Sequence, residues 1–314
     1  LHVHSSLDKG YGLLAGAVCR VPVVVHLHMP HNYRKPRSIL GRWRAGLRGW
    51  AHGLAVKHYI AVSEDVKRAH LPFRPGRIPV TVVYNGVEAE RFCQPDPAAL
   101  VALRRELGLG GQGPVLINVA MMRKHKGQRW LIEMMPWVLE RYPQARLLIV
   151  GDGEERRALE SMVRDRGLGQ AVRLLGVRHD VPHLLALAQV FLFPSTGEGL
   201  GIAALEAMAA ARPVVAFRLP VLAEFIEDGV TGYLATPEDP ADLAQKVLQV
   251  LSDPRLAEAM GQRGRQVVEE RFSAQASVRR LESIYLSLVE PGARQPVASE
   301  PLGRQRVRGT PEGL

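Results

Sequence analysis

The stretch Pro194–Ala209 reads PSTGEGLGIAALEAMA and directly follows the apolar run VFLF at residues 190–193. That run is short and aromatic enough to predict a buried parallel strand. Ile202, Leu205 and Met208 recur at helical spacing, so the chain predicts a strand, a glycine-rich loop and then a helix. In a parallel α/β sheet this order places the amino end of the helix at the edge of the sheet where ligands bind.

The amino end of this helix is a predicted anion site flanked by two acids. The first amides of a helix have no intrahelical partner, and the helix dipole adds positive charge there. Glu198 stands in the loop, and Glu206 lies about 7.5 Å along the helix at about 1.5 Å rise per residue. Carboxylates accept hydrogen bonds strongly, so the pair suits a ligand with hydroxyls on both sides of a diphosphate, as in a nucleotide-sugar. The alternative is an amphipathic helix with two surface acids.

The surrounding motifs resemble those of a known family. Glu198 and Glu206 are separated by seven residues, and PVVA at 213–216, Glu224 and DGVTG at 228–232 follow in order. Together they resemble the signature of the family 4 retaining glycosyltransferases. The resemblance implies an α/β fold of the GT-B type, with two Rossmann-like domains whose parallel sheets face each other across a cleft. It also implies that Glu206 binds the donor ribose and that a catalytic glutamate and the amides after it bind the donor sugar, namely Glu198, Gly199, Leu200, Gly201 and Ile202.

The same resemblance places cations near the donor. Lys126 and Gly127 match the Lys-Gly pair of the family, in which the lysine reaches the donor diphosphate. Met121 stands where the family often has an arginine, and Arg123 is the candidate to replace that cation. A solvated basic loop is the alternative for this segment. In the loop GVRHD at 176–180 the resemblance puts the nucleobase, held mainly by backbone, with Arg178 as the donor-binding side chain.

A histidine near the end of the strand at 21–28 completes the implied site. The resemblance matches His28, with His26 as second choice, to the family's catalytic histidine that faces the donor sugar. A core or surface histidine is the alternative for either residue. The loop at Leu219 and Pro220 departs from the family's frequent Gly-Gly, so the approach of backbone to the donor is less certain there.

Length and composition indicate a globular protein of two domains. The chain has 314 residues, of which 46% are hydrophobic and 23% charged. Paired prolines at Pro95 and Pro97 mark a linker, so we expect an N-terminal domain at 1–94 and a nucleotide-sugar-binding domain at 95–272. A terminal helix at 273–290 returns to the first domain, and 291–314 form a disordered tail. Because Leu1 already reads as mid-domain sequence, we expect the first domain to be incomplete.

Apolar runs and helical periodicity predict the remaining elements. The expected strands are 21–28, 59–63, 80–84, 115–120, 145–150, 172–175, 190–193 and 213–216. The expected helices are 13–19, 37–56, 98–107, one from 128, 154–166, one from 201, 239–251, 254–270 and 277–289.

Charge and cysteine usage restrict the partners. Cys19 and Cys93 are the only cysteines, without CxxC or histidine-rich metal spacing, so we expect no disulfide, no metal site and a cytoplasmic location. The formal net charge is +10, but no nucleic-acid-binding pattern accompanies it. No acid occurs between residues 9 and 63, and the predicted helix at 37–56 carries Trp43 and Trp50. This pattern suits an anionic acceptor or peripheral contact with the inner face of an anionic membrane; the alternative is a helix packed on its own domain.

The implied function is transfer of a sugar from a nucleotide donor, UDP- or GDP-linked, to a glycan, lipid-linked or small-molecule acceptor with retention of configuration. No Asp-x-Asp motif is present, so Lys126 and the helix end take the role of a metal, and we expect metal-independent transfer without a cofactor. Two alternatives stay open: another GT-B enzyme, such as a phosphorylase or sugar-nucleotide epimerase, and a catalytically degraded GT-B binding protein.

Overall fold

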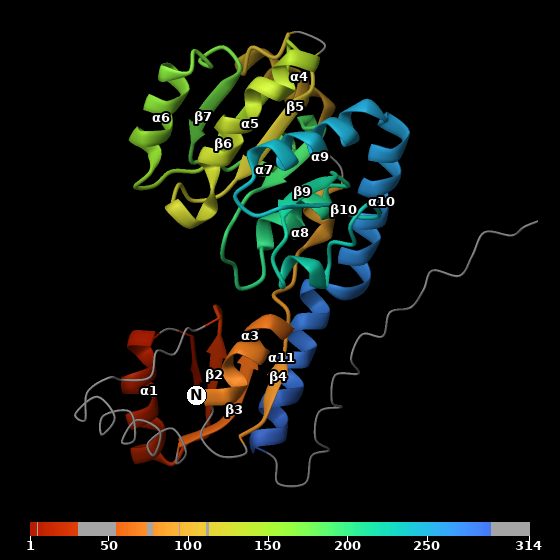
Figure 1. The fold of residues 1–314 in the computed structure, drawn as a ribbon. Helices are drawn as coiled ribbons and strands as arrows, with labels where there is room; N and C mark the ends of the chain where they lie inside the picture. The colour runs from red at the N-terminus through yellow and green to blue at the C-terminus, as the bar shows by residue number, and fades with distance from the viewer. Residues whose placement is uncertain (5, 31–54, 74–77, 94, 111–112, 290–314) are drawn as a thin grey trace, which may run out of the picture. The chain divides into compact units, whose positions relative to one another are not determined.

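The chain divides into two compact units (Figure 1). The computed structural model describes residues 1–4, 6–30, 55–73, 78–93, 95–110 and 113–289. Unit 1 comprises Leu1–Val83 and the chain from Arg279 onward, and unit 2 comprises Tyr84–Val278. The division falls earlier than the boundary expected at residue 94. Residues after Tyr84 bond into unit 2, since the amide of Val87 donates to the carbonyl of Phe272 over 2.8 Å.

Unit 1 is built on a four-stranded parallel sheet in the order β1-β2-β3-β4. All five residues of β2 are buried, as expected for an apolar strand covered on both faces. The strands are β1 (His2–Val3), β2 (Val23–Leu27), β3 (Val56–Ala61) and β4 (Val80–Val82). The helical segments are α1 (Ser6–Cys19), α3 (Glu64–His70) and the 3₁₀ turn η1 (Leu71–Phe73).

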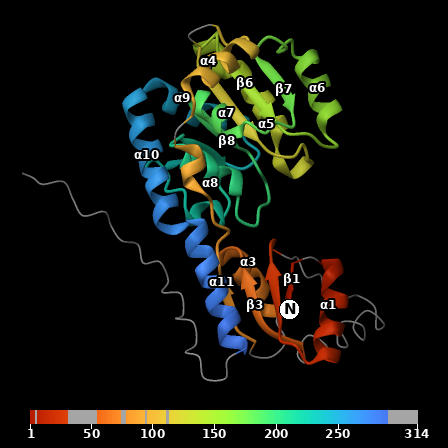
Figure 2. The same ribbon diagram turned by 180° about the vertical axis from the view of Figure 1, so that it is seen from behind.

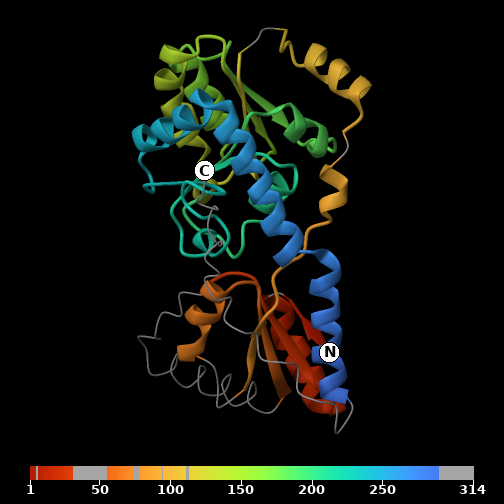
Figure 3. The ribbon, with the colours of Figure 1, turned by 90° about the vertical axis from the view of Figure 1, so that its right-hand side faces the viewer.

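One face of this sheet packs against the C-terminal part of α11 (Ala274–Val289), as Figure 3 shows. Ile284 of α11 is fully buried against Val24, Ile60 and Val83. Ser63, expected to end a strand, instead caps α3, because its hydroxyl accepts the amide of Val66 over 3.1 Å. Most of the helix predicted at 37–56 lies outside the described residues, and its last residue, Val56, already belongs to β3.

Unit 2 contains a six-stranded parallel sheet in the order β10-β9-β8-β5-β6-β7. The strands are β5 (Val115–Val119), β6 (Arg146–Val150), β7 (Val172–Gly176), β8 (Val190–Phe193), β9 (Val214–Phe217) and β10 (Gly232–Ala235). The α-helices are α4 (Pro97–Glu106), α5 (Gln128–Arg141), α6 (Arg156–Asp165), α7 (Val181–Leu187), α8 (Ile202–Ala209), α9 (Pro240–Ser252) and α10 (Pro254–Arg271). The 3₁₀ turns are η2 (Ala89–Phe92), η3 (Lys124–Lys126) and η4 (Leu222–Glu224).

Helices cover both faces of the unit 2 sheet. On one face, buried residues of α5, α6 and α9 form one core with alternate residues of the strands, among them Leu116, Ile149 and Leu192. On the other side α7 contacts β5, and α8 contacts β8 and β9. The long helix α10 packs beside α8 and α9 in both views (Figures 1 and 2). The two parallel sheets confirm the predicted α/β class.

Three helices of unit 2 begin with an aspartate cap that is followed by a proline. Asp96, Asp239 and Asp253 each accept amides of the first turn, and a proline follows each as the first helical residue. Pro97 was expected to interrupt the chain as part of a linker. It instead opens α4, because its fixed backbone angle and missing amide are compatible with a first helical turn. The tail predicted at 291–314 lies outside the described residues.

Candidate functional site

The glycine-rich loop after β8 leads into α8 as the sequence predicted. Gly201 precedes the helix with a φ of 94°, in the region that favours glycine. A Cβ atom at this position would lie 2.9 Å from Leu222 Cδ2 and 3.3 Å from Phe193 Cε1, so a side chain does not fit without displacing these neighbours. No side chain caps the helix, whose first amides to bond back into the turn are those of Ala204 and Leu205. The helix start is therefore suited to an anion.

A second loop, after β5, is tied to this one by backbone contacts. The amide of Thr196 donates to the carbonyl of His125 over 2.8 Å. Gly127 has a φ of 71°, and a Cβ atom there would lie only 2.0 Å from the carbonyl oxygen of Pro194. Only glycine permits this approach. The two loops are thus held side by side, and Lys126 is brought next to the loop that carries Glu198.

Lys126 and Glu198 form a direct ion pair in this site. Nζ of Lys126 lies 2.6 Å from Oε1 of Glu198, across 72 positions of sequence. The side chain of Glu198 is 8% exposed and that of Lys126 is 20% exposed, so little water reaches the pair. The ammonium group also lies 5.9 Å from the centre of the Phe193 ring. A hydrogen bond between two charged groups is stronger than one between neutral groups, and low exposure strengthens it further.

Glu206 stands further along α8 and is half-buried. Burial raises the pKa of its carboxyl group above the usual range, and the positive charge of Arg91 opposes this shift. The helix thus carries one acid before its amino end and a second, partly desolvated acid in its body. This is the arrangement predicted from the spacing of the two glutamates; the roles assigned to them remain predictions.

The other predicted donor-binding cations lie in different surroundings. Arg178 is already bound: its guanidinium donates to both carboxylate oxygens of Asp180, at 2.8 and 2.6 Å, and to Glu106 at 2.7 Å. These bonds raise the pKa of Arg178, and the guanidinium lowers the pKa of the Asp180 carboxyl. Arg123 is exposed and precedes η3, where its carbonyl accepts the amide of Lys126. The side chain of Met121 is 53% exposed.

Asn118 is a structural residue of the site that sequence reasoning missed. It is 1% exposed within β5, and its side-chain amide donates to the carbonyl of Leu192 over 2.8 Å. This bond fixes β5 against β8, the two strands whose loops carry Lys126 and Glu198. An asparagine inside the apolar run VLINV was the available signal, because a buried amide needs a partner.

His28 belongs to unit 1, separately from the residues above. Its Nε2 lies 2.9 Å from Nδ1 of His4, so the two imidazoles share a hydrogen bond. His26, the second choice, is buried at 4% exposure and stacks on His28 with ring centres 4.4 Å apart. The sequence reasoning named neither His2 nor His4. The signal was the pattern His-x-His at the ends of two successive strands, which puts all four side chains on one face of neighbouring strands.

Two family profiles match most of the chain. The profile described as "Glycosyl transferases group 1" matches residues 102–267, and the one described as "Glycosyltransferase Family 4" matches residues 1–91. The chain belongs to the group 1 glycosyl transferases. The glycosyltransferase family inferred from the glutamate motif is thereby confirmed, and the retaining mechanism stays a prediction.

Curated relatives of this glycosyl transferase act on different sugars. The alpha-D-kanosaminyltransferase of Streptomyces kanamyceticus is 29% identical over 295 residues, which cover 91% of this chain and 76% of the relative. The N-acetyl-alpha-D-glucosaminyl L-malate synthase of Bacillus anthracis is 29% identical, over 75% of this chain and 59% of the relative. A GDP-mannose-dependent phosphatidylinositol monomannoside mannosyltransferase of Mycolicibacterium smegmatis is 37% identical, over 57% of this chain and 49% of the relative.

Solved glycosyltransferase structures share the fold. HepE of Anabaena, crystallised in complex with UDP, has a TM-score of 0.81 and 24% identity, and the match covers 91% of this chain and 79% of HepE. Sucrose-phosphate synthase of Thermosynechococcus elongatus has a TM-score of 0.75 and 23% identity, over 90% and 72% of the two chains. These likenesses confirm the GT-B fold of this glycosyl transferase. Among its described residues, no helix combines the length and apolar character needed to cross a membrane.

Proposed function

We propose that this glycosyl transferase moves a hexosyl group from a nucleoside-diphosphate sugar to an acceptor hydroxyl, with retention of the anomeric configuration. The observation that carries the proposal is the Lys126–Glu198 pair beside the uncapped start of α8. The names of the relatives, which include a GDP-mannose-dependent enzyme, and the UDP-glucose complex of HepE support a nucleotide-sugar donor.

The basic part of the site suits the leaving diphosphate. In the transfer, the bond between the anomeric carbon and the diphosphate breaks, a bond to the acceptor oxygen forms, and the proton of the acceptor hydroxyl passes to an oxygen of the departing diphosphate. Charge develops on the departing phosphate oxygens and on the sugar ring. The ammonium of Lys126 and the free amides of Gly201 and Ile202 stabilise the phosphate charge electrostatically, without reorganisation at the moment of reaction. Arg123 on the exposed part of the same loop supplies a second cation.

The acidic part of the site suits hydroxyl groups. When the diphosphate takes Lys126 as its partner, the carboxylate of Glu198 is released to accept hydrogen bonds from the donor sugar. The ribose hydroxyls bind Glu206, and backbone near Arg178 holds the base. His28 is proposed to be the catalytic histidine that faces the donor sugar. The acceptor is a glycan, a lipid-linked sugar or a small molecule.

Metal-independent transfer, a cytoplasmic setting and peripheral attachment to an anionic membrane belong to the same proposal. The first rests on the presence of Lys126 where a metal would otherwise neutralise the diphosphate. The last rests on the basic segment at 34–57, most of which lies outside the described residues.

A donor panel tests the proposal. The purified chain is incubated with UDP-glucose, UDP-N-acetylglucosamine or GDP-mannose, and thermal stabilisation identifies the donor that binds. Release of the nucleoside diphosphate is then followed with a panel of acceptor sugars, and NMR of the product gives the anomeric configuration. Glu198→Gln should lower the rate at least tenfold, because one charge-assisted hydrogen bond is worth about 1.5–3 kcal/mol. Glu133→Gln, which alters an ion-paired acid of α5 with 16% exposure, is the matched control.

Three outcomes would contradict this function. Stabilisation by none of the donors would favour a degraded binding site. Conversion of the donor sugar without an acceptor would favour an epimerase, and dependence on inorganic phosphate would favour a phosphorylase. A product with inverted anomeric configuration would contradict the retaining mechanism, but it would still support a sugar transferase.

A further inference from the structure

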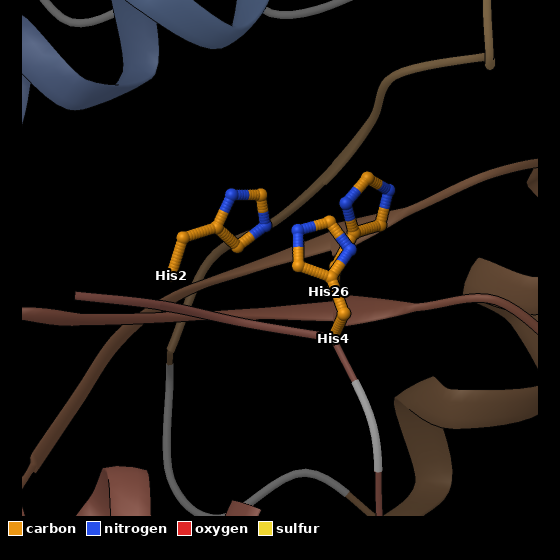
Figure 4. Close-up of side chains that lie close together, drawn as sticks. All are labelled: His2, His4 and His26. Atoms are coloured by element: carbon orange, nitrogen blue, oxygen red, sulfur yellow. The ribbon is translucent and has the colours of Figure 1, made fainter. Parts of the chain in front are cut away.

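Four histidines gather at the carboxyl ends of β1 and β2. His2 and His4 alternate along the first strand and the residues after it, and His26 and His28 alternate along the second. The register pairs His2 with Val24 and Val3 with Val25, so these even-numbered residues face the same side of the sheet. Figure 4 shows the rings of His2, His4 and His26 gathered on that side of the strands.

The distances within this cluster suit shared ligation. One ring nitrogen from each of His2, His4 and His26 can be chosen so that all three lie within 4.8 Å of one another. Nδ1 of His4 lies 2.9 Å from Nε2 of His28. Imidazole nitrogens bind Zn²⁺ at about 2.0–2.1 Å, which sets two ligands of a tetrahedral site about 3.4 Å apart. Binding would therefore require the nitrogens, now within 4.8 Å of one another, to move to that spacing.

Several of these nitrogens are buried and have no hydrogen-bond partner among the described residues. His26 is 4% exposed, and both of its ring nitrogens lack a partner; so does Nε2 of His2. A buried polar atom without a partner is destabilising. Stacking of His26 on His2 and His28, with ring centres 5.2 and 4.4 Å apart, satisfies the ring faces but not the nitrogen lone pairs. A bound cation would satisfy the nitrogen of each ring that carries the lone pair.

The rings of His2 and His26 are also crowded by burial and by the other histidines. Burial, reinforced by repulsion from His28, His2 and His4, lowers the pKa of His26 to about 3. Burial and the neighbouring His4 and His28 lower the pKa of His2 to about 4.

Tyr285 provides an outer partner for the cluster. Its hydroxyl group lies 2.5 Å from Nδ1 of His2, on the ring edge opposite the unpartnered Nε2. Metal-binding histidines almost always place their second nitrogen on such an oxygen partner, which fixes the tautomer and the ring orientation. When Nδ1 of His2 carries the proton and donates it to the Tyr285 hydroxyl, the lone pair of Nε2 is available for a metal.

We propose that His2, His4 and His26 form a binding site for a divalent transition-metal ion of the zinc type, beside His28. Imidazole ligands without carboxylates favour Zn²⁺, Cu²⁺ or Ni²⁺ over Mg²⁺, Ca²⁺ and Mn²⁺. The site lies in unit 1, and the proposal does not depend on the sugar-transfer function. It adds to the sequence prediction, which assigned no metal site because the chain has no CxxC, histidine-rich metal spacing or Asp-x-Asp motif.

Titration of the full chain with Co²⁺ tests the site. The protein is purified without a histidine tag, treated with EDTA and dialysed. Co²⁺ should bind with one equivalent per chain and give the intense visible absorption of a tetrahedral site, and Zn²⁺ should displace it. His4→Gln, an exposed position, should weaken Co²⁺ binding more than tenfold. Tyr285→Phe should weaken it about 10–100-fold through loss of the outer partner.

His58→Gln is the matched control. His58 is also buried on this face of the sheet, paired with Val24 in the register, but its Nε2 is bonded to the hydroxyl of Thr81 at 2.8 Å. This variant should bind Co²⁺ like the wild type. Absence of the visible absorption at one equivalent, or equal loss of binding in His4→Gln and His58→Gln, would overturn the proposal. His26→Gln is informative only if circular dichroism shows a folded protein, and the two other variants decide the question without it.

Discussion

Removal of the ammonium group of Lys126 should destabilise unit 2. In Lys126→Met, the carboxylate of Glu198 remains 8% exposed but loses the cation at 2.6 Å. Methionine keeps much of the side-chain volume beside Phe193, so the change is mainly electrostatic. Glu198→Gln removes the opposite charge from the same contact while keeping a hydrogen-bond acceptor.

The structure sets the size of the effect between two limits. Exposed ion pairs contribute about 0.2–1 kcal/mol, whereas breaking a fully buried pair costs about 3–5 kcal/mol. Lys126 retains 20% exposure, so water reaches one side of the contact, and the loss should lie near the middle of this range. We expect Lys126→Met to cost about 2 kcal/mol in the free energy of unfolding of unit 2, and the double variant Lys126→Met/Glu198→Gln to recover at least half of it.

Native-state hydrogen exchange measures this quantity for each unit separately, which a single unfolding curve of a two-unit chain does not. The slowest amides of β8 report the unfolding of unit 2. Lys124→Met is the control, because Lys124 is exposed in the same turn. Strictly additive effects of the two single variants, or a cost in Lys126→Met no larger than in Lys124→Met, would refute the idea that this ion pair stabilises the site.

Three further outcomes follow from the site. Gly127→Ala should lower the free energy of unfolding of unit 2 by more than about 2 kcal/mol, because its Cβ would lie 2.0 Å from the carbonyl oxygen of Pro194 at a positive φ. Gly197→Ala is the control: a Cβ there would have no atom within 4 Å, so this variant should be nearly neutral in the same exchange assay. Transfer should persist in excess EDTA; complete loss restored by Mn²⁺ or Mg²⁺ would contradict a diphosphate held by Lys126. Glu206→Gln should raise the melting temperature at pH 7 and yet weaken nucleotide binding about tenfold, as calorimetry can measure. Because burial raises the folded-state pKa of Glu206 above 4.5, the folded protein takes up a proton as the pH falls through that raised pKa, so the stability difference should disappear toward pH 4.5.

Local chemistry allowed most of the fold to be predicted. The strand, loop and helix around Gly201 follow from apolar spacing and from glycines that the backbone requires. The helices after Asp239 and Asp253 were predicted from helical periodicity, and the structure shows each of these acids capping the helix that its following proline opens. Ser63 and Pro97 were misread because the same residue types end one element and begin the next. At both positions only the following helix decides which role the residue takes.

Contacts between distant segments could not be predicted from local patterns. Lys126 and Glu198 were each recognised, but that they bind each other depends on β5 and β8 being neighbours in the sheet. The histidine cluster likewise requires β1 to pair with β2 in one register. A shift of one residue would turn His26 to the opposite face and separate the rings.

On the proposed function, the ion pair also explains how the site can hold two buried charges and bind a charged donor. Lys126 and Glu198 neutralise each other in this structure, so neither charge is left buried without a partner. On the proposed function, the donor brings one partner for each: diphosphate oxygens for the ammonium and sugar hydroxyls for the carboxylate. A free nucleoside diphosphate satisfies only the lysine and leaves Glu198 at 8% exposure without its cation. The pair therefore favours the complete nucleotide-sugar over the product nucleotide, and Glu198→Gln should narrow the difference between their affinities.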